Sequence, residues 1–168
     1  MVPIISVMAG ASGSGKTTLL EKLLPKLQAY GLRIGVVKHA CHISMPDDGT
    51  DGSRIVNTGV AAVAIVSPQG NLVVTRPFQE PSLEEMAAGF KNVDLVIAEG
   101  YKNCHFPKIE VLRKGCYNKI YSPLDELLAV MTDMPEIIPA GVKYLALDAI
   151  DDLAKIIINW YEKHKEVK

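Results

Sequence analysis

A short stretch near the N-terminus has the residue types and spacing needed to bind a polyphosphate. It reads Gly10-Ala11-Ser12-Gly13-Ser14-Gly15-Lys16-Thr17-Thr18 and contains the phosphate-loop pattern G-x-x-x-x-G-K-[ST]. Glycines allow backbone N–H groups to converge on a phosphate, because no side chain blocks the approach. The pattern also predicts that Lys16 reaches the terminal phosphates and that the Thr17 hydroxyl is a ligand of Mg²⁺.

The residues on either side of this loop predict the strand and the helix that the motif requires. Ile4 to Met8 is an apolar run with the length of a buried strand. The leucines that follow the loop recur at helical spacing and predict a helix from Lys16 to Tyr30, kinked at Pro25. The alternative is a Gly/Ser-rich turn that contains Lys-Thr by chance, and these flanking elements argue against it.

The rest of the chain alternates strand-like and helix-like segments, which is typical of an α/β protein. Strands are predicted over 32–38, 61–66, 71–75, 93–98, 108–113, 127–131 and 144–147, and helices over 51–58, 82–90 and 150–164. We therefore predict a P-loop NTPase (Rossmann-like) fold, a mostly parallel sheet flanked by helices. The segments 61–66 and 71–75 predict a hairpin that adds an antiparallel portion.

Length, charge and cysteine content narrow the class of protein. A chain of 168 residues suits a single nucleotide-binding domain over 1–168. A formal net charge of −1 gives no general basic surface for nucleic acid, and no apolar run approaches the length of a membrane span. The three cysteines form neither an even set nor a C-x-x-C pair. We expect a cytoplasmic protein without nucleic-acid or membrane partners.

Polar residues follow several of the predicted strands, at the edge of a parallel sheet where ligands collect. Glu99 is the clearest of them, because a carboxylate at the end of an apolar strand can hold Mg²⁺ or orient an attacking water. The predicted catalytic residues are thus Lys16 and Glu99, and the predicted metal ligands are Thr17 and Glu99. Asp94 begins the same strand and belongs to the opposite edge. The alternative for Glu99 is a solvated loop carboxylate.

Asp133 follows another predicted strand and has two readings. A carboxylate can accept two hydrogen bonds from the N1–H and N2 amino groups of guanine, whereas adenine offers no such donor pair. The Asn-Lys-x-Asp form of that signal is absent, and Thr132-Asp133 before a Met-Pro pair is equally typical of a turn cap.

The polar segment between the second strand and the next helix holds possible metal ligands. They are His39, Cys41, His42, Asp47, Asp48 and Asp51. The histidines lack a second pair of ligands at metal-site spacing, so a polar loop is the alternative. The aspartates can bind Mg²⁺ or remain hydrated, and Asp51 with Arg54 can instead cap and charge a short helix.

Motifs along most of the chain resemble the MobB family, the GTP-binding adaptor proteins of molybdopterin-guanine dinucleotide biosynthesis. They are the phosphate loop with the helix that contains Pro25, Val37-Lys38-His39 with His42, Gly49 with Asp51, Arg54, Glu99-Gly100-Tyr101-Lys102, Pro107 to Arg113 and Ala129 to Pro135. The phosphate loop is shared by many families, but the Lys-His and Glu-Gly-Tyr-Lys segments in this order are more specific. Two family segments differ: Pro-Gly-Lys-Asp-Ser is Asp48 to Gly52 here, and Ala-Gly-Ala is Thr58 to Val60.

The resemblance implies GTP and Mg²⁺ as ligands, at most slow GTP hydrolysis, and a homodimer. It implies a role beside the MobA-type guanylyltransferase that joins GMP to molybdopterin. By residue, Gly10 to Thr18 would bind the phosphates and Mg²⁺, Glu99 would serve the metal or the water, and Asp133 would read guanine.

Three other functions remain open from the residues. A P-loop small-molecule kinase shares the loop and the sheet, but it usually has an arginine-rich lid, and the arginines at 54, 76 and 113 are scattered in the sequence. An interaction module would use the nucleotide only as a structural element. A metallochaperone-type GTPase would bind metal through His39 and His42.

Overall fold

The computed structural model describes residues 2–42, 49–76 and 79–165 and divides the chain into two compact units. One unit combines Met1–His39 with Leu83–Lys168, and the other is Ala40–Ser82. We call them the sheet unit and the hairpin unit. The second is an insertion in the sequence of the first, and one nucleotide-binding domain over 1–168 stays a prediction. No helix within the described ranges is long and apolar enough to cross a membrane.

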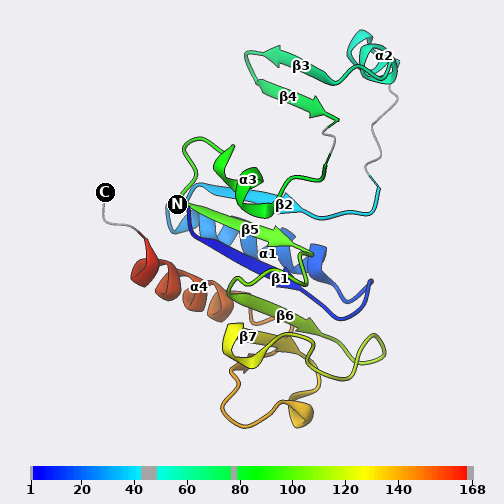
Figure 1. Cartoon of the computed structure of the whole chain (residues 1–168). Coiled ribbons are helices and arrows are strands. Elements are labelled where there is room, and N and C mark those ends of the chain that lie inside the picture. The colour runs from blue at the N-terminus through cyan, green and yellow to red at the C-terminus, as the bar shows by residue number, and fades with distance from the viewer. Residues whose placement is uncertain (1, 43–48, 77–78, 166–168) are drawn as a thin grey trace. The chain divides into compact units, whose positions relative to one another are not determined.

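The sheet unit is built on a six-stranded sheet in which every neighbouring pair of strands is parallel (Figure 1). The strand order is β2-β5-β1-β6-β7-β8. The strands are β1 (Ile4–Met8), β2 (Ile34–Lys38), β5 (Leu95–Glu99), β6 (Lys108–Leu112), β7 (Leu127–Thr132) and β8 (Tyr144–Leu145). The helices are α1 (Lys16–Ala29), α3 (Leu83–Ala88) and α4 (Ile150–His164), with 3₁₀ turns at Leu124–Glu126 and Pro135–Ile137. This arrangement confirms the predicted α/β class.

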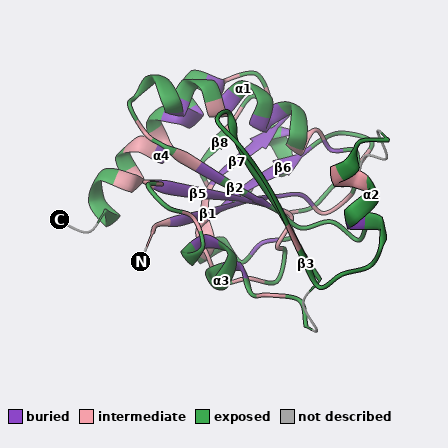
Figure 2. Ribbon diagram, turned by 90° about the horizontal axis from the view of Figure 1, so that it is seen from above, coloured by how far each residue is buried: buried purple, intermediate pink, exposed green. Residues whose placement is uncertain are grey.

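Helices cover both faces of the sheet. Leu23 of α1 and Leu153 of α4 are buried in one apolar cluster with Ile5 and Ile97 of the sheet. Leu83 of α3 belongs to a second cluster on residues of the same strands that point to the other face. All residues of β1, β5 and β6 are buried, as the purple central strands of Figure 2 show. Burial on both faces explains why β1 and β5 are continuous apolar runs in the sequence.

The strand register brings the carboxyl ends of β1, β2 and β5 together. Glu99 pairs with Val7 of β1 and with Lys38 of β2. The sequence predicted this strand over 93–98, but it begins two positions later and includes Glu99. The reason is at its start, where the side chain of Asp94 accepts hydrogen bonds from Arg33, at 2.8 Å to Nη2 and 2.9 Å to the backbone N–H. Asp94 therefore lies at the opposite edge from Glu99, as predicted.

The hairpin unit contains α2 (Asp51–Asn57) and a two-stranded antiparallel sheet of β3 (Ala62–Ser67) and β4 (Gly70–Thr75). The predicted hairpin is confirmed, and it forms a sheet of its own. The cap of α2 differs from the expectation: Thr50, not Asp51, accepts the N–H of Ser53 at 3.3 Å, because an N-cap acceptor must precede the helix. Asp51 instead lies in the first turn and pairs with Arg54 at 3.4 Å.

Candidate phosphate-binding site

The loop between β1 and α1 has the backbone conformation that its glycines permit. Gly13 and Gly15 have φ angles of 75° and 93°, in the left-handed region where a side chain is strained. Gly15 is the N-cap of α1 and no side chain within the described residues caps it. The N–H groups of the first helical turn therefore remain available to an anion, and the helix dipole favours one there.

Residues that follow β5 and β6 hold this loop in place. The ring of Tyr117 would lie 2.3 Å from a Cβ atom on Gly10, so only glycine fits at that position. Lys102 Nζ donates a hydrogen bond to the Gly10 carbonyl at 2.9 Å, and the buried Ser14 hydroxyl donates one to the Ala11 carbonyl at 2.9 Å. Gly10 thus serves a close packing contact, in addition to the approach to phosphate that the motif predicts.

Thr17 and Glu99 meet at the start of α1. The Thr17 hydroxyl donates to Glu99 Oε1 at 3.2 Å, and the Glu99 residue is only 7% exposed. Lys38 Nζ lies 3.2 Å from Glu99 Oε2 and 3.5 Å from Thr17 Oγ1, so a protein cation already occupies this pair of oxygens. Hydroxyl and carboxylate oxygens are ligands that suit Mg²⁺. The donor set fits the predicted metal, and the half-exposed Lys38 side chain has room to move aside.

Asp133 lies at the carboxyl end of β7 and is exposed. Its Oδ1 accepts the backbone N–H of Lys114 at 2.8 Å, which ties the end of β7 to the segment after β6. The turn cap that the sequence offered as the alternative comes instead from Thr132, whose hydroxyl accepts the backbone N–H of Met134 at 2.9 Å. A second role in reading guanine stays a prediction.

The described residues give no support to a metal centre outside the phosphate loop. Within the described ranges, no three His, Cys, Asp or Glu side chains come together as a group that could hold a metal ion. His39 instead contacts Tyr101, with ring centroids 5.3 Å apart. Asp47 and Asp48 lie outside the described residues.

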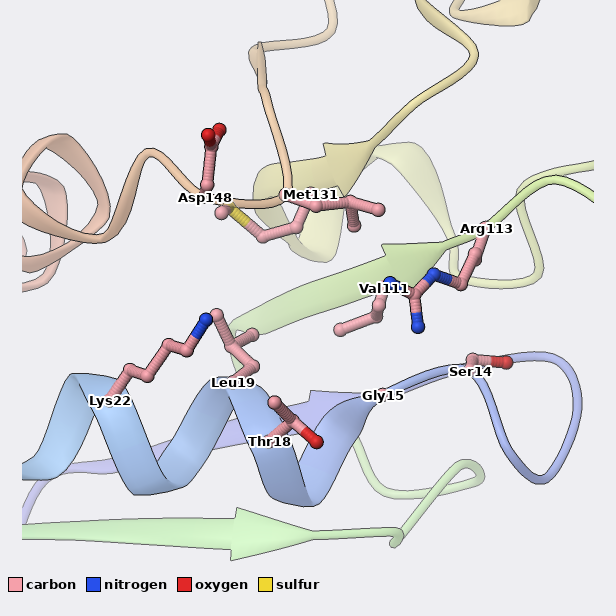
Figure 3. A pocket seen from close by; sticks show the side chains of 10 residues that line it. Ser14, Gly15, Thr18, Leu19, Lys22, Val111, Arg113, Met131 and Asp148 are labelled. Carbon is pink, nitrogen blue, oxygen red and sulfur yellow. The ribbon is translucent and has the colours of Figure 1, made fainter.

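The structure also brings Arg113 to the phosphate loop, which the sequence reading missed. Its Nη1 lies 3.4 Å from a Cβ built on Gly15, and Figure 3 shows the guanidinium above the loop. Arg113 directly follows β6, and β6 lies beside β1 in the sheet. The sequence showed no arginine placed beside the loop, but strand order brings Arg113 there. Its position at the end of a strand was the available signal.

Arg113 also lines a pocket of about 150 Å³ beside the loop (Figure 3). The lining residues come from the loop, α1, β6, β7 and the turn before α4; they are Ser14, Gly15, Thr18, Leu19, Lys22, Val111, Arg113, Met131, Leu147 and Asp148. The cations around this edge of the sheet, which are Lys16, Lys22, Lys38, Lys102 and Arg113, outnumber the carboxylates of Glu99, Asp133 and Asp148 there, although the chain has a net charge of −1. The arrangement suits a polyphosphate with a further group attached.

Comparison with known proteins agrees with this geometry. Residues 4–133 match the family model for molybdopterin guanine dinucleotide synthesis protein B, MobB. A molybdopterin-guanine dinucleotide biosynthesis adapter protein of Haemophilus influenzae is 36% identical, and the match covers 95% of this chain and 89% of that protein. The Escherichia coli protein of the same name is 30% identical, with 97% and 95% covered.

Solved structures have the same fold. A crystal structure of molybdopterin-guanine biosynthesis protein B matches with a TM-score of 0.70 and 27% identity, covering 94% of this chain and 99% of the other. A MobB homologue from Bacillus stearothermophilus matches with a TM-score of 0.69 at 23% identity, covering 96% and 99%, and supports the fold alone. The family model and the two relatives together show that this chain belongs to the MobB family.

Proposed function

We propose that this protein is a GTP-binding adapter of molybdopterin guanine dinucleotide biosynthesis, which assists a MobA-type guanylyltransferase in joining GMP to molybdopterin. The observation that carries the proposal is the phosphate loop with the Thr17–Glu99 pair at the carboxyl edge of the sheet. Family membership supports the pathway.

In this proposal the loop from Gly10 to Thr18 binds the phosphates of GTP, and Lys16 contacts the terminal ones. Thr17 and Glu99 hold Mg²⁺, directly or through water, after the Lys38 ammonium leaves them. When bound, Mg²⁺ neutralises charge on the terminal phosphates. Glu99 is also the residue placed to orient water, and we propose slow Mg²⁺-dependent GTP hydrolysis in a protein that acts mainly as an accessory factor.

The experiment that tests this function is reconstituted GMP transfer to molybdopterin by the guanylyltransferase, with and without the protein. We expect the wild-type protein to stimulate transfer and the Lys16→Ala variant, whose GTP affinity should be roughly a hundredfold lower, to have little effect. Equal stimulation by both proteins would favour the interaction module, in which the nucleotide is only structural.

Asp133 is proposed to select guanine in this site. The Asp133→Asn variant should lower the affinity for GTP by roughly tenfold, the value of one hydrogen bond to a charged group, and change ATP affinity little. Calorimetric titration with both nucleotides measures the ratio. If both affinities fell equally, Asp133 would act only by holding the backbone of Lys114.

A small-molecule kinase is the second candidate, because Arg113 lies beside the loop where a kinase needs a cation over the phosphates. Transfer of labelled γ-phosphate to a metabolite without any partner protein would establish it. A metallochaperone-type GTPase predicts stoichiometric metal in the purified protein, and its absence would remove that candidate.

We further propose a homodimer in the cytoplasm. The hairpin unit supports the dimer, because Val66 is 78% exposed and Val73 is 56% exposed on a two-stranded sheet. A two-stranded hairpin is marginally stable without a covering surface, and a second copy of the chain would supply one. The three free cysteines, Cys41, Cys104 and Cys116, are consistent with a reducing compartment.

A further inference from the structure

The segment that follows β6 contacts the phosphate loop in two places. We call residues 114–122 the strap. The ring of Tyr117 packs so closely against Gly10 that a Cβ atom built there would lie 2.3 Å from it. The Cys116 thiol donates a weak hydrogen bond to the Gly13 carbonyl, with the sulfur and oxygen 3.9 Å apart. The strap therefore contributes to the shape of the loop that is proposed to bind phosphate.

The strap depends on side chains for its own position. Every residue of the strap is described, and none belongs to a helix or a strand. Tyr117 and Ile120 pack against the apolar cluster of β6 and β7. At the start of the strap, Lys114 donates its backbone N–H to Asp133 at 2.8 Å. Because connecting segments move more than the elements they join, the other end of the strap needs a contact of the same kind.

Glu110 of β6 supplies the contact at that other end. The residue is 0% exposed, and its two carboxylate oxygens accept the backbone N–H groups of Tyr121 at 2.8 Å and Ser122 at 2.9 Å. The Ser122 hydroxyl in turn donates to Sδ of Met8, the last residue of β1, at 3.0 Å. Glu110 also pairs with Met8 in the sheet register. The end of the strap is thereby fixed beside the strand that leads into the phosphate loop.

The chemistry of a carboxylate explains why a glutamate suits this position. Burying a charged side chain opposes folding unless hydrogen bonds compensate for the lost water, and an apolar residue would fill the same space without that penalty. A carboxylate accepts at both oxygens, whereas an amide has one acceptor and would turn its NH₂ group toward the second N–H. Both N–H groups at Glu110 belong to the strap, so its carboxylate serves to hold that segment.

We propose that Glu110 is a positioning residue for phosphate binding. It holds the strap, and through Tyr117 the strap holds the phosphate loop in the conformation that receives the nucleotide phosphates. The inference rests on the proposed nucleotide binding. Because Glu110 is fully buried, it acts on the ligand only through the strap, in contrast to Lys16 and Thr17, which are proposed to touch the ligand.

The test is calorimetric titration of the full-length protein with GTP and Mg²⁺ in a double-mutant cycle. Glu110→Gln should weaken GTP binding by roughly tenfold, the value of a hydrogen bond to a charged group. Tyr117→Ala should weaken it by a similar factor. The double variant should also lose roughly tenfold, and not a hundredfold, because both changes break the same connection to the loop.

Two further variants separate positioning from general stability. Glu126→Gln removes a carboxylate that pairs with Lys108 of the same strand β6, and no hydrogen bond joins its side chain to the strap among the described residues. It should leave GTP affinity within about twofold of wild type even where it lowers the melting temperature. Tyr117→Phe keeps the ring that packs on Gly10 and should restore the affinity that Tyr117→Ala loses.

Wild-type GTP affinity in folded Glu110→Gln protein, or a hundredfold loss in the double variant, would overturn the inference. If Glu110→Gln does not fold, Tyr117→Ala decides the matter. An unchanged affinity in that variant overturns the inference, and a loss that Tyr117→Phe restores supports it. Failure of the wild-type protein to bind GTP would instead overturn the proposed function.

Discussion

The sheet unit and the hairpin unit differ in what covers their apolar residues. In the sheet unit, helices on both faces bury every residue of β1 and β5. In the hairpin unit, most residues of β3 and β4 are exposed, among them Leu72 at 50% and Val73 at 56% (Figure 2). Both pairs of strands have apolar sequences, so composition alone does not distinguish them.

This difference in burial assigns a different task to each unit, ligand binding to one and assembly to the other. The fully buried central strands β1, β5 and β6 fix their own ends, and the phosphate loop, Glu99 and Arg113 all depend on those ends. An exposed apolar hairpin lacks such support and has the surface of a binding element. We therefore expect ligand binding to depend on the sheet unit and assembly to depend on the hairpin unit.

Lys16→Ala should produce the largest effect. It removes the cation at the terminal phosphates, and we expect GTP affinity to fall by roughly a hundredfold or more, because charged hydrogen bonds are lost together with Coulomb attraction. Calorimetric titration measures the affinity, and gel filtration should show an unchanged oligomeric state. A monomer produced by this change would contradict the separation of the two tasks.

A double substitution, Val66→Lys with Val73→Lys, tests the hairpin unit. Charges on both strands should prevent a second copy from covering them and convert a dimer to a monomer in sedimentation measurements. GTP affinity should stay within about twofold of wild type, since neither side chain belongs to the phosphate site. The control is Gln69→Lys, which adds charge in the turn between the strands without replacing an apolar residue. Val63→Lys is unsuitable as a control, because Val63 is half-buried in β3.

Glu99→Gln should have a smaller effect, confined to the metal. The amide retains the shape of the carboxylate but loses its charge, so the gain in GTP affinity on adding Mg²⁺ should shrink by roughly tenfold. Affinity without Mg²⁺ should change little or rise, because a negative charge near the phosphates is removed. An unchanged response to Mg²⁺ would show that Glu99 serves only to hold Lys38.

The smallest effect concerns the stability of the sheet unit and involves the ion pair between Lys108 and Glu126, away from the phosphate loop. The buried Lys108 ammonium pairs with Glu126, and this hydrogen bond, followed by one to His105, lowers the pKa of the Glu126 carboxyl. Because the pKa of Glu126 is lower in the folded than in the unfolded protein, its carboxylate stabilises the fold at pH values above the unfolded-state pKa of roughly 4.3. This stabilisation is lost as the pH falls through the folded-state pKa.

Glu126→Gln should therefore lower the melting temperature near pH 7, where the carboxylate would be charged. The difference from wild type should narrow as the pH falls below about 4. Thermal melts between pH 3 and pH 7 would show this, and a difference that is constant with pH would contradict the role of the ion pair. Glu136→Gln, at an exposed position, is a matched control.

Much of the fold and part of the site followed from local sequence patterns. The loop at Gly10–Thr18 and the strand that ends at Glu99 are encoded by adjacent residues, so their approximate places were predictable. Arg113 was not placed at the loop, because its position there depends on β6 lying beside β1 in the sheet. Strand order is decided by long-range packing and is absent from any short window of sequence.

The pocket could not be predicted for the same reason. Its lining joins Ser14, Val111, Met131 and Leu147, which are far apart in the sequence. Likewise, nothing in the local pattern distinguishes the buried apolar strands of the sheet unit from the exposed β3 and β4, because burial depends on which helices pack against each strand.

Titration of the purified wild-type protein with GTP and with ATP, each with and without Mg²⁺, is the direct test of the proposed nucleotide site. We expect GTP to bind more tightly than ATP and Mg²⁺ to strengthen GTP binding through Thr17 and Glu99. Tighter binding of ATP would move the small-molecule kinase ahead of the adapter. Binding of neither nucleotide would contradict the assignment of the loop between β1 and α1 as a nucleotide site.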